Sequence, residues 1–412
     1  MSSPVGIPTL TTGPDEGPDP SDPDPTRPGA TRGGPTRRTV LARAGLGAFA
    51  LATVAVGARA LDQGVLDAGE GHAYAPWTAF DPTDGDLPGA LLDAAVLAAS
   101  AHNMQNWRFE VTGAGVDVHD DPTRSLGVVD PVRREARIGL GCAAANIELV
   151  AAAAGWTPRV EAFGQGVRST LAARITLTPG GEPGTDPRVA AIGARHSDRG
   201  AYPAQVPPQA LLDAVGGAAV DGIDGVHVRW VTGGAMAKVG DLLVDAAAAV
   251  VADEAMSRAG FAWFRSEWDD VQSLRDGLTI DAQALSPLVT VIAKLAPVSR
   301  STGDRSWLTA TRDVHVATAR AYAVVTTDAS GPASHIDAGR ALERLHLDLV
   351  ARGWAMQHMN QAVEVAEREA ALGRMADVGA RLAVLCGPGV VAMARVGRPS
   401  GRARPSPRRP VQ

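Results

Sequence analysis

The sequence predicts an α+β fold built from two related half-domains. Short apolar segments rich in strand-forming residues alternate with alanine-rich segments that are typical of helices. The expected strands are 108–111, 116–119, 170–177, 226–231, 323–327, 381–386 and 390–396, and the expected helices include 91–99 and 238–259. A helical bundle is the alternative, but the Gly-Pro-Gly turn at 387–389 between two apolar runs favours a hairpin.

An internal repeat indicates the two halves. The stretch GCAAANIELVAAAAGW at 141–156 matches GRALERLHLDLVARGW at 339–354, with Gly, Ala, Leu, Ala, Gly and Trp at the same spacing. Each copy predicts a buried helix that ends at a glycine and is followed by an extended segment. We therefore expect a first half at 61–180 and a second half at 181–412.

Composition and missing motifs argue against several classes of function. The chain has 412 residues and is 45% hydrophobic, enough for a substantial core. A net charge of -6 gives no reason to expect nucleic acid as a partner. The two cysteines, Cys142 and Cys386, are expected to be buried thiols. The chain carries no zinc-protease, Walker, Rossmann or nucleophile-elbow motif, so hydrolase and nucleoside-triphosphate functions have no support, and no metal site is expected.

The first 60 residues indicate a targeting segment. Residues 1–36 are rich in Pro, Gly, Asp and Thr, which predicts a disordered tail. Residues 37–60 join paired arginines to an uncharged run at 44–57 and an Ala-Arg-Ala site, and so resemble a twin-arginine (Tat) signal. The run is shorter than the roughly 20 residues of a membrane span. We expect the Tat export machinery as a partner, membrane contact through 37–60 and an exported or cell-envelope location; the alternative is an amphipathic first helix in a cytoplasmic protein.

Two further motifs resemble one flavoprotein family. The segment AASAHNMQNWRF at 98–109 resembles the A-P-S-x-x-N-x-Q-P-W-x-F loop of nitroreductases, and RHSDR at 195–199 resembles their R-[RH]-S-x-[RK] phosphate motif. Together with the repeated helix, these segments are similar to the Acg-like branch of the nitroreductase superfamily, over nearly all of the chain after the signal.

The resemblance implies a nitroreductase-like α+β fold in which two pseudo-symmetric half-domains mimic a homodimer. Each half keeps only one of the two motifs, so one FMN per chain is expected at the interface of the halves. Guanidinium and hydroxyl groups suit the FMN phosphate, and an apolar slot with a few polar groups suits its ring. The residues expected to bind the cofactor are Arg195, His196, Ser197, Arg199, Ser100, Asn103, Met356, Gln357, Arg408 and Arg409, with His358 as a further ring neighbour.

The predicted activity is that of an FMN-dependent oxidoreductase that alternates between a small-molecule electron donor and an acceptor. No catalytic side chain is required, because the flavin supplies the chemistry. We expect a monomer. The alternative function is an FMN-sequestering or storage protein, and a third is a relic that binds no flavin.

Several of these segments also have plain structural interpretations. The basic segment 195–199 could be a solvated turn, and the C-terminal arginines could form a flexible tail. The extension at 255–315 carries aromatic residues between Phe261 and Trp268 that either cover the flavin or pack ordinary core. Ala99 and Asn106 stand where the family has proline, which predicts a less rigid loop.

Overall fold

The computed structural model describes residues 56–83, 86–163 and 169–411. The predicted disordered tail and most of the predicted signal therefore lie outside the described residues. The last part of that signal segment belongs to a helix at 56–62.

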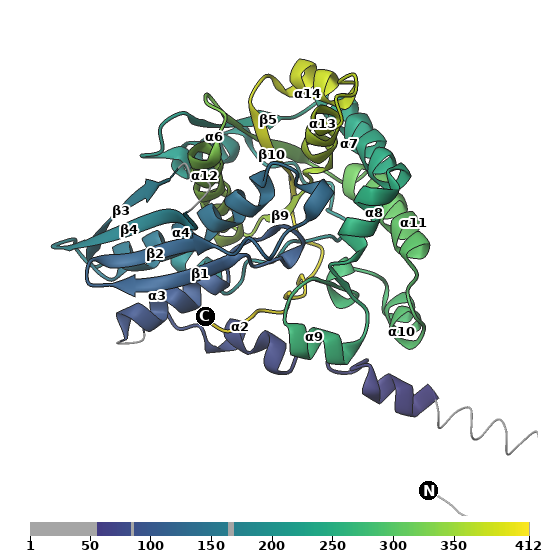
Figure 1. Cartoon of the computed structure of the whole chain (residues 1–412), viewed down its shortest axis with the longest axis horizontal. Helices are drawn as coiled ribbons and strands as arrows, with labels where there is room; N and C mark the ends of the chain where they lie inside the picture. The colour runs from purple at the N-terminus through teal and green to yellow at the C-terminus, as the bar shows by residue number, and fades with distance from the viewer. Residues whose placement is uncertain (1–55, 84–85, 164–168, 412) are drawn as a thin grey trace, which may run out of the picture. The chain divides into compact units, whose positions relative to one another are not determined.

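The first half-domain contains a four-stranded antiparallel sheet (Figure 1). Its spatial order is β1-β2-β4-β3, and every neighbouring pair is antiparallel. The strands are β1 (Trp107–Thr112), β2 (Gly115–Asp120), β3 (Trp156–Ala162) and β4 (Leu171–Pro179). The helix α4 (Arg134–Ala153) connects β2 to β3 and packs on this sheet.

The second half-domain repeats this topology. Its sheet has the order β5-β8-β10-β9, again with antiparallel neighbours, and α12 (Pro332–Ala351) connects β8 to β9 as α4 connects β2 to β3. The strands are β5 (Val226–Val231), β8 (Ala321–Thr327), β9 (Ala355–His358) and β10 (Val390–Gly397). The predicted α+β fold of two pseudo-symmetric halves is confirmed.

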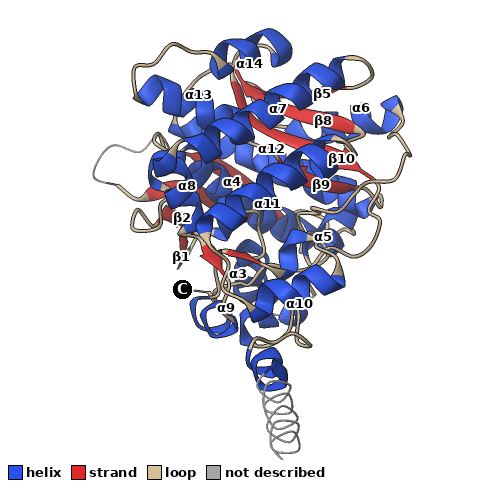
Figure 2. Ribbon diagram, turned by 90° about the vertical axis from the view of Figure 1, so that its right-hand side faces the viewer, coloured by secondary structure: helices blue, strands red, loops and turns tan. Residues whose placement is uncertain are grey.

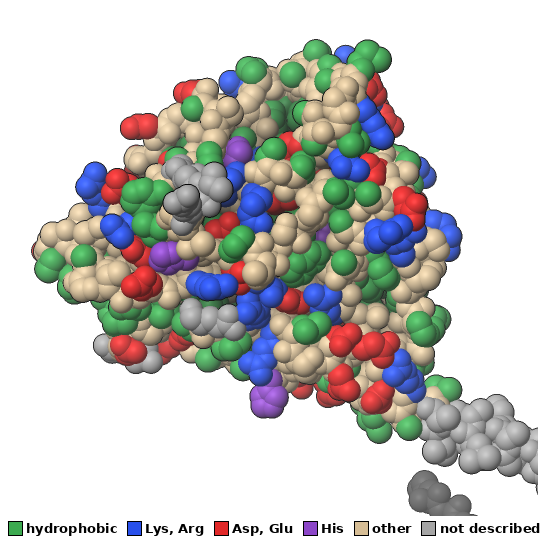
Figure 3. All heavy atoms as spheres, viewed as in Figure 1, with side chains coloured by type: hydrophobic (Ala, Val, Ile, Leu, Met, Phe, Trp, Pro, Cys, Tyr) green, Lys and Arg blue, Asp and Glu red, His purple; other side chains and the backbone are tan. Residues whose placement is uncertain are grey.

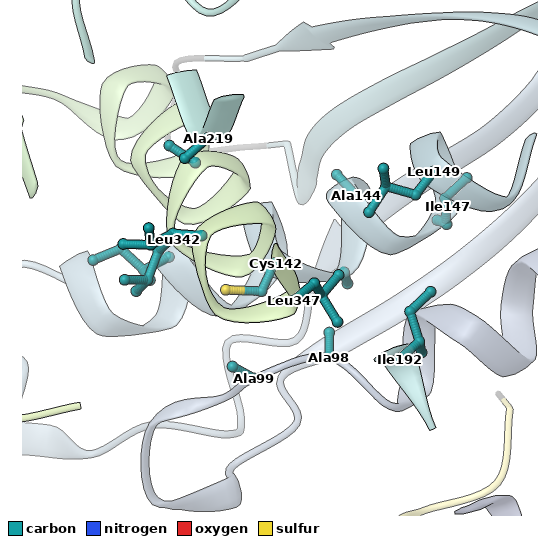
Figure 4. Packing of buried hydrophobic residues seen from close by; sticks show 14 of the residues in the cluster. Ala98, Ala99, Cys142, Ala144, Ile147, Leu149, Ile192, Ala219, Leu342 and Leu347 are labelled. Carbon is teal, nitrogen blue, oxygen red and sulfur yellow. The ribbon is translucent and has the colours of Figure 1, made fainter. Parts of the chain in front are cut away.

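The two halves join where α4 crosses α12, and glycine makes this crossing close. A Cβ atom on Gly141 would lie 1.9 Å from the carbonyl oxygen of Ile336, and a Cβ atom on Gly339 would lie 2.1 Å from that of Ile138. Both contacts join a glycine to the isoleucine three residues before the other glycine, as a two-fold relation requires. Figure 2 shows the two helices in the interior, and Figure 4 shows part of the apolar cluster around Cys142.

The ends of the central helices also follow the predicted repeat. Gly155 and Gly353 have φ values of 83° and 74°, which only glycine adopts without strain, and each precedes the next strand. Cys142 and Cys386 are both buried and free, as expected. By length and composition α4 could cross a membrane, but it is mostly buried here and forms the core of this half.

A long insertion distinguishes the second half. A two-residue turn connects β1 to β2, whereas nearly 90 residues separate β5 from β8 and form one side of the molecule in Figure 1. The insertion comprises α7 (Ala235–Ala252), α8 (Glu254–Phe261), β6 (Phe264–Arg265), α9 (Trp268–Leu274), β7 (Leu278–Thr279), η4 (Asp281–Gln283), α10 (Pro287–Leu295), α11 (Arg300–Ala310) and η5 (Thr311–Val316). The predicted extension at 255–315 falls within it.

The remaining elements surround this frame. They are η1 (His72–Tyr74), α2 (Ala75–Ala79), α3 (Leu87–Val96), η2 (Ala101–Asn103), η3 (Gly127–Val129), α5 (Pro187–Ile192), α6 (Gln209–Val220), α13 (Gln361–Ala371) and α14 (Val378–Cys386). Basic and acidic side chains are interspersed over the face shown in Figure 3.

Two sequence predictions of secondary structure were wrong. The expected strand 381–386 is the end of α14, because a short apolar run carries no period that separates strand from helix. Gly387, at a φ of 84°, ends that helix and does not begin a hairpin turn. The expected helix 238–259 breaks at Asp253, whose carboxylate accepts hydrogen bonds from the backbone N–H groups of Ala255 and Met256 and caps α8.

The helix crossing yields a stability prediction. Gly339→Ala should lower the free energy of unfolding by about 1–3 kcal/mol, because the added methyl group forces two backbones apart. Gly217→Ala, in α6, is the matched control: no atom lies within 4 Å of its added Cβ, and a gain of about 0.5–1 kcal/mol is expected. Denaturant unfolding measures both, and equal stabilities of the two variants would contradict the close crossing.

Candidate active site

A cavity of about 590 Å³ lies where the halves, the insertion and the C-terminal tail meet. Its volume is in the range of sites that bind cofactors and small molecules. The cavity brings together residues that are separated by more than 300 positions in the sequence, such as Trp77 and Arg408. The predicted cofactor-binding residues that line it are Ser100, Asn103, Arg195, His196, Ser197, Arg199, Gln357 and Arg408.

Two predicted residues do not line the cavity. The side chain of Met356 is fully buried in the apolar core, while its carbonyl oxygen accepts a hydrogen bond of 3.1 Å from the backbone N–H of Asp198. The backbone N–H of Arg409 donates to the side-chain oxygen of Gln105 at 2.8 Å. In the structure, Met356 thus supports the 195–199 segment and Arg409 fastens the tail to the loop after Ser100.

Arg195 is buried and already paired with an acid. Its Nε lies 2.9 Å from a carboxylate oxygen of Glu343 in α12, and its Nη2 donates to the carbonyl oxygen of Leu97 at 2.9 Å. Burial raises the pKa of Glu343, and the charge of Arg195 opposes that rise. The charge of Arg195 is therefore largely balanced within the protein.

Arg199 and Arg408 line the same cavity and form no ion pair with a carboxylate in the described part of the chain. Arg199 donates to the carbonyl oxygen of Ala282, and burial lowers its pKa to about 10. Arg408 donates to the side-chain oxygen of Asn103 and lies over the ring of Trp77, 4.7 Å from its centre. Burial, and then the charge of Arg195, lower the pKa of Arg408 well below its usual value. A bound anion would stabilise both cations.

Two neutral histidines lie beside these arginines. Burial and the nearby arginines, above all Arg195, lower the pKa of His196 and of His358 to about 3. The Nδ1 atom of His196 and the Nε2 atom of His358 are buried without a hydrogen-bond partner among the described residues, and both residues line the cavity. Such atoms are costly unless a ligand or water satisfies them. At neutral pH these rings can therefore donate or accept hydrogen bonds without adding charge.

The loop around Asn103 is strained but well fastened. His102, Asn103 and Gln105 have φ values of 49°, 53° and 52°, which non-glycine residues rarely adopt. The hydroxyl of Ser100 accepts from the backbone N–H of Gln105 at 2.9 Å, and the side chain of Asn106 donates to Asp120 at 2.8 Å. The lower rigidity expected from the missing prolines stays a prediction, and these hydrogen bonds are the contacts that hold the loop in place.

The side chain of Asn103 joins three parts of the chain. Its amide nitrogen donates to the carbonyl oxygens of Pro407 in the tail and Gly277 in the insertion, at 2.8 and 3.2 Å, and its oxygen accepts from Arg408. The tail is also held by Trp77, whose ring N–H donates to the carbonyl oxygen of Ser406 at 2.7 Å. The C-terminal segment is thus an ordered wall of the cavity, ending beside α2 in Figure 1.

The insertion supplies the apolar walls. Phe261 and Phe264 line the cavity with their rings stacked 5.8 Å apart, and side chains of α10 and α11 extend the same surface. Trp263 and Trp268 are not among the lining residues; Trp263 lies under Arg124 and Arg265. Of the two alternatives for these aromatics, Phe261 and Phe264 border the site, whereas the tryptophans pack elsewhere.

Several lining residues were missed at the level of sequence. They are Trp77 of α2, His102, and the acidic residues Glu135 of α4 and Glu364 of α13. His102 stands at a variable position of the 98–109 motif and the other three lie outside both motifs, and the fold brings them together from four separate segments. Only the unusual number of ionisable residues in the apolar context of α4 and α13 hinted at such a role.

Comparisons with known proteins indicate one family without covering the whole chain. No family model matches. Over 120 residues the chain is 31% identical to two proteins of Mycobacterium tuberculosis, from strains CDC 1551 / Oshkosh and H37Rv, which are named as candidate NAD(P)H nitroreductases. The match covers 29% of this chain, and the chain spans about a third of the length of these curated relatives.

Solved structures of nitroreductases align with this chain at lower sequence identity. A nitroreductase with bound FMN from Bacteroides fragilis aligns with 52% of this chain and 90% of its own, at 16% identity and a TM-score of 0.31. The FMN-dependent nitroreductase NfnB from Mycobacterium smegmatis, in complex with NADPH, aligns with 53% and 90%, at 17% identity and a TM-score of 0.31.

The position of Asn103 yields a second prediction. Asn103→Leu should lower the free energy of unfolding by about 1–3 kcal/mol, because buried carbonyl groups and Arg408 lose their partner. Limited proteolysis should also cut the C-terminal tail faster. Gln209→Leu is the control, since its exposed amide bonds only to Asp213. A tail cleaved at the wild-type rate in Asn103→Leu would show that Asn103 does not hold it.

Proposed function

We propose that this chain is an FMN-dependent oxidoreductase of the nitroreductase type, with one FMN bound between its two halves. The observation that supports the proposal best is the shared cavity, in which Arg199 and Arg408 have no acidic partner and face apolar walls. The M. tuberculosis relatives are named as candidate NAD(P)H nitroreductases, which fits the same chemistry.

The residues of the cavity fit FMN group by group. A phosphate with nearly two negative charges requires about two unpaired cations, and Arg199 and Arg408 provide them beside the hydroxyl of Ser197. The buried Nε atom of Arg408 has no hydrogen-bond partner and is available to such an anion. The stacked rings of Phe261 and Phe264 suit a flat apolar ring. When bound, FMN would supply hydride and electron transfer, while the protein positions it and excludes water.

The pseudo-symmetric counterpart of the site holds ion pairs. Cys142, which lines the cavity, corresponds in the repeat to Arg340 of α12. Arg340 pairs with Glu148 at 3.0 Å, and Glu148 also pairs with Arg344 at 2.7 Å. The cations at this position are therefore paired with an acid, unlike Arg199 and Arg408 in the cavity. This supports one FMN per chain.

FMN storage is the second candidate function. The insertion and the tail both border the cavity, and the tail is fastened by Trp77 and Asn103. Such a cover would suit a protein that retains flavin without turnover. Oxidation of NAD(P)H with a quinone or nitroaromatic acceptor favours the enzyme, whereas bound flavin without turnover favours storage.

FMN binding is tested by replacing single arginines with glutamine, which removes the positive charge and keeps most of the side-chain volume. Arg199→Gln and Arg408→Gln should each raise the Kd for FMN on the order of 10–100-fold, because each loses a charge-assisted contact of about 1.5–3 kcal/mol. Fluorescence titration of the flavin-free protein measures the Kd. Arg195 is a poorer target, since removing it leaves Glu343 buried without a partner.

Arg404→Gln serves as the matched control for this titration. Arg404 lies in the same tail, is exposed, and donates only to the carbonyl oxygen of Ala68. Its Kd for FMN should equal that of the wild type. If Arg199→Gln and Arg408→Gln are folded and bind FMN as tightly as Arg404→Gln, the phosphate assignment fails.

We also propose that residues 37–60 direct export by the Tat machinery, with the exported or envelope location that this implies. The support is the sequence alone. Replacing Arg37 and Arg38 by lysine should retain the protein in the cytoplasm, as measured by cell fractionation. Unchanged export of that variant would contradict the signal.

A further inference from the structure

The lining of the cavity includes acidic residues that the proposed cofactor site does not use. Glu364 of α13 lines the cavity together with Asn360, Gln361 and Glu135. The same cavity is lined by the cationic residues Arg199 and Arg408. The insertion adds apolar lining residues, among them Val250 of α7 and Met256 of α8.

The carboxyl group of Glu364 has no hydrogen-bond or ion-pair partner among the described residues, whereas its acidic neighbours are engaged. Glu135 accepts from Arg134 at 2.6 Å and from Asn360 at 3.1 Å. Glu367 accepts from Arg134 at 2.7 Å. Asp130 accepts from the backbone N–H groups of residues 135 and 136. Of the two glutamates that line the cavity, Glu135 is thus engaged and Glu364 has a carboxyl group without a partner among the described residues.

The charges around Glu364 oppose its ionisation. The ionisable groups that act on it are Glu135 and Arg134 of α4, Asp130 after η3 and Glu367 of α13, three acids against one base. The Nε and Nη1 atoms of Arg134 donate to Glu367, Glu135 and the carbonyl oxygen of Val391.

Of the cations on other elements packed against α13, Arg381 of α14 pairs with Asp245 and Arg395 of β10 donates to Gln357. Leu382 of α14 and Met393 of β10 belong to the apolar cluster beneath the helix. Asp304 of α11 also lines the cavity and accepts from the hydroxyl of Ser257 at 2.6 Å.

We propose that Glu364 is a catalytic acid, which donates a proton to an oxygen atom of the electron acceptor as that acceptor is reduced in the cavity. This inference rests on the proposed oxidoreductase function. It names the acceptor class: a small, largely apolar molecule with an oxygen that gains negative charge on two-electron reduction, such as a quinone.

The proton balance of this step is simple. Two-electron reduction of a quinone by hydride from the reduced flavin leaves one oxygen with a negative charge. An O–H bond forms on that oxygen while the O–H bond of Glu364 breaks, and the electron pair stays on the carboxylate. Solvent then returns a proton to Glu364. Both oxygens of the product are hydroxyl groups, and charge is conserved.

Glu364 is suited to hold that proton near neutral pH. Burial, and then the charge of Glu135, raise its pKa well above the usual value of a glutamate. The neutral acid is present below this raised pKa and is lost as the pH rises through it. The rate of acceptor reduction should therefore fall as the pH rises through the same range.

The test compares Glu364→Gln with the wild type and with Asp241→Asn, an exposed acid on α7. Infrared pH-difference spectra of the flavin-free protein should show the C=O band of a protonated carboxylic acid at neutral pH. That band should lose intensity in Glu364→Gln and keep its wild-type intensity in Asp241→Asn. Its presence in Glu364→Gln at wild-type intensity would overturn the assignment of a neutral Glu364.

The second part of the test measures the rate of quinone reduction by stopped flow, with protein whose bound flavin has first been reduced. Glu364→Gln should slow this step on the order of 100-fold and remove its decline at high pH, while Glu364→Asp should restore part of the rate. Unchanged rates and pH profile in Glu364→Gln with full FMN content would overturn the proton-donor role and leave the proposed function intact. Failure of the wild type to bind FMN would overturn both.

Discussion

The close crossing of α4 and α12 is the constraint on which the rest of the structure depends. Two glycines let the backbones touch, each against the carbonyl of an isoleucine in the other helix. Each helix carries its own sheet, so the crossing fixes how the two halves face each other. The cavity lies beside this crossing and is lined by Gly139 and Cys142 of α4 and Leu342 of α12.

Buried charged side chains connect the two halves. Arg195 pairs with Glu343 within the second half and donates to the carbonyl oxygen of Leu97 in the first half. Arg134 of α4 reaches Glu367 and the carbonyl oxygen of Val391 in the second half. Buried ion pairs of this kind add little net stability, but an arrangement that separates their charges is strongly destabilised. Among the described residues, Arg199 and Arg408 form no ion pair and the carboxyl group of Glu364 has no partner, and all three line the cavity.

Local patterns predicted much of the fold and part of the site. The repeat at 141–156 and 339–354 identified the central helices and their glycine ends, because helix periodicity and C-capping are local properties. The segments 98–109 and 195–199 were recognised as motifs, and they meet in one cavity. The hydrogen bonds of Asn103 could not be predicted, since its partners lie in the insertion and in a tail about 300 residues away. Glu364 was missed because the acids that raise its pKa are brought together only by folding.

The central claim is that one chain encloses one complete flavin site. Native mass spectrometry of the chain reconstituted with excess FMN tests this claim most directly, because it reports cofactor count and oligomeric state together. The account predicts a monomer whose mass exceeds that of the bare chain by one FMN. Two flavins per chain, or flavin retained only by a dimer, would contradict it.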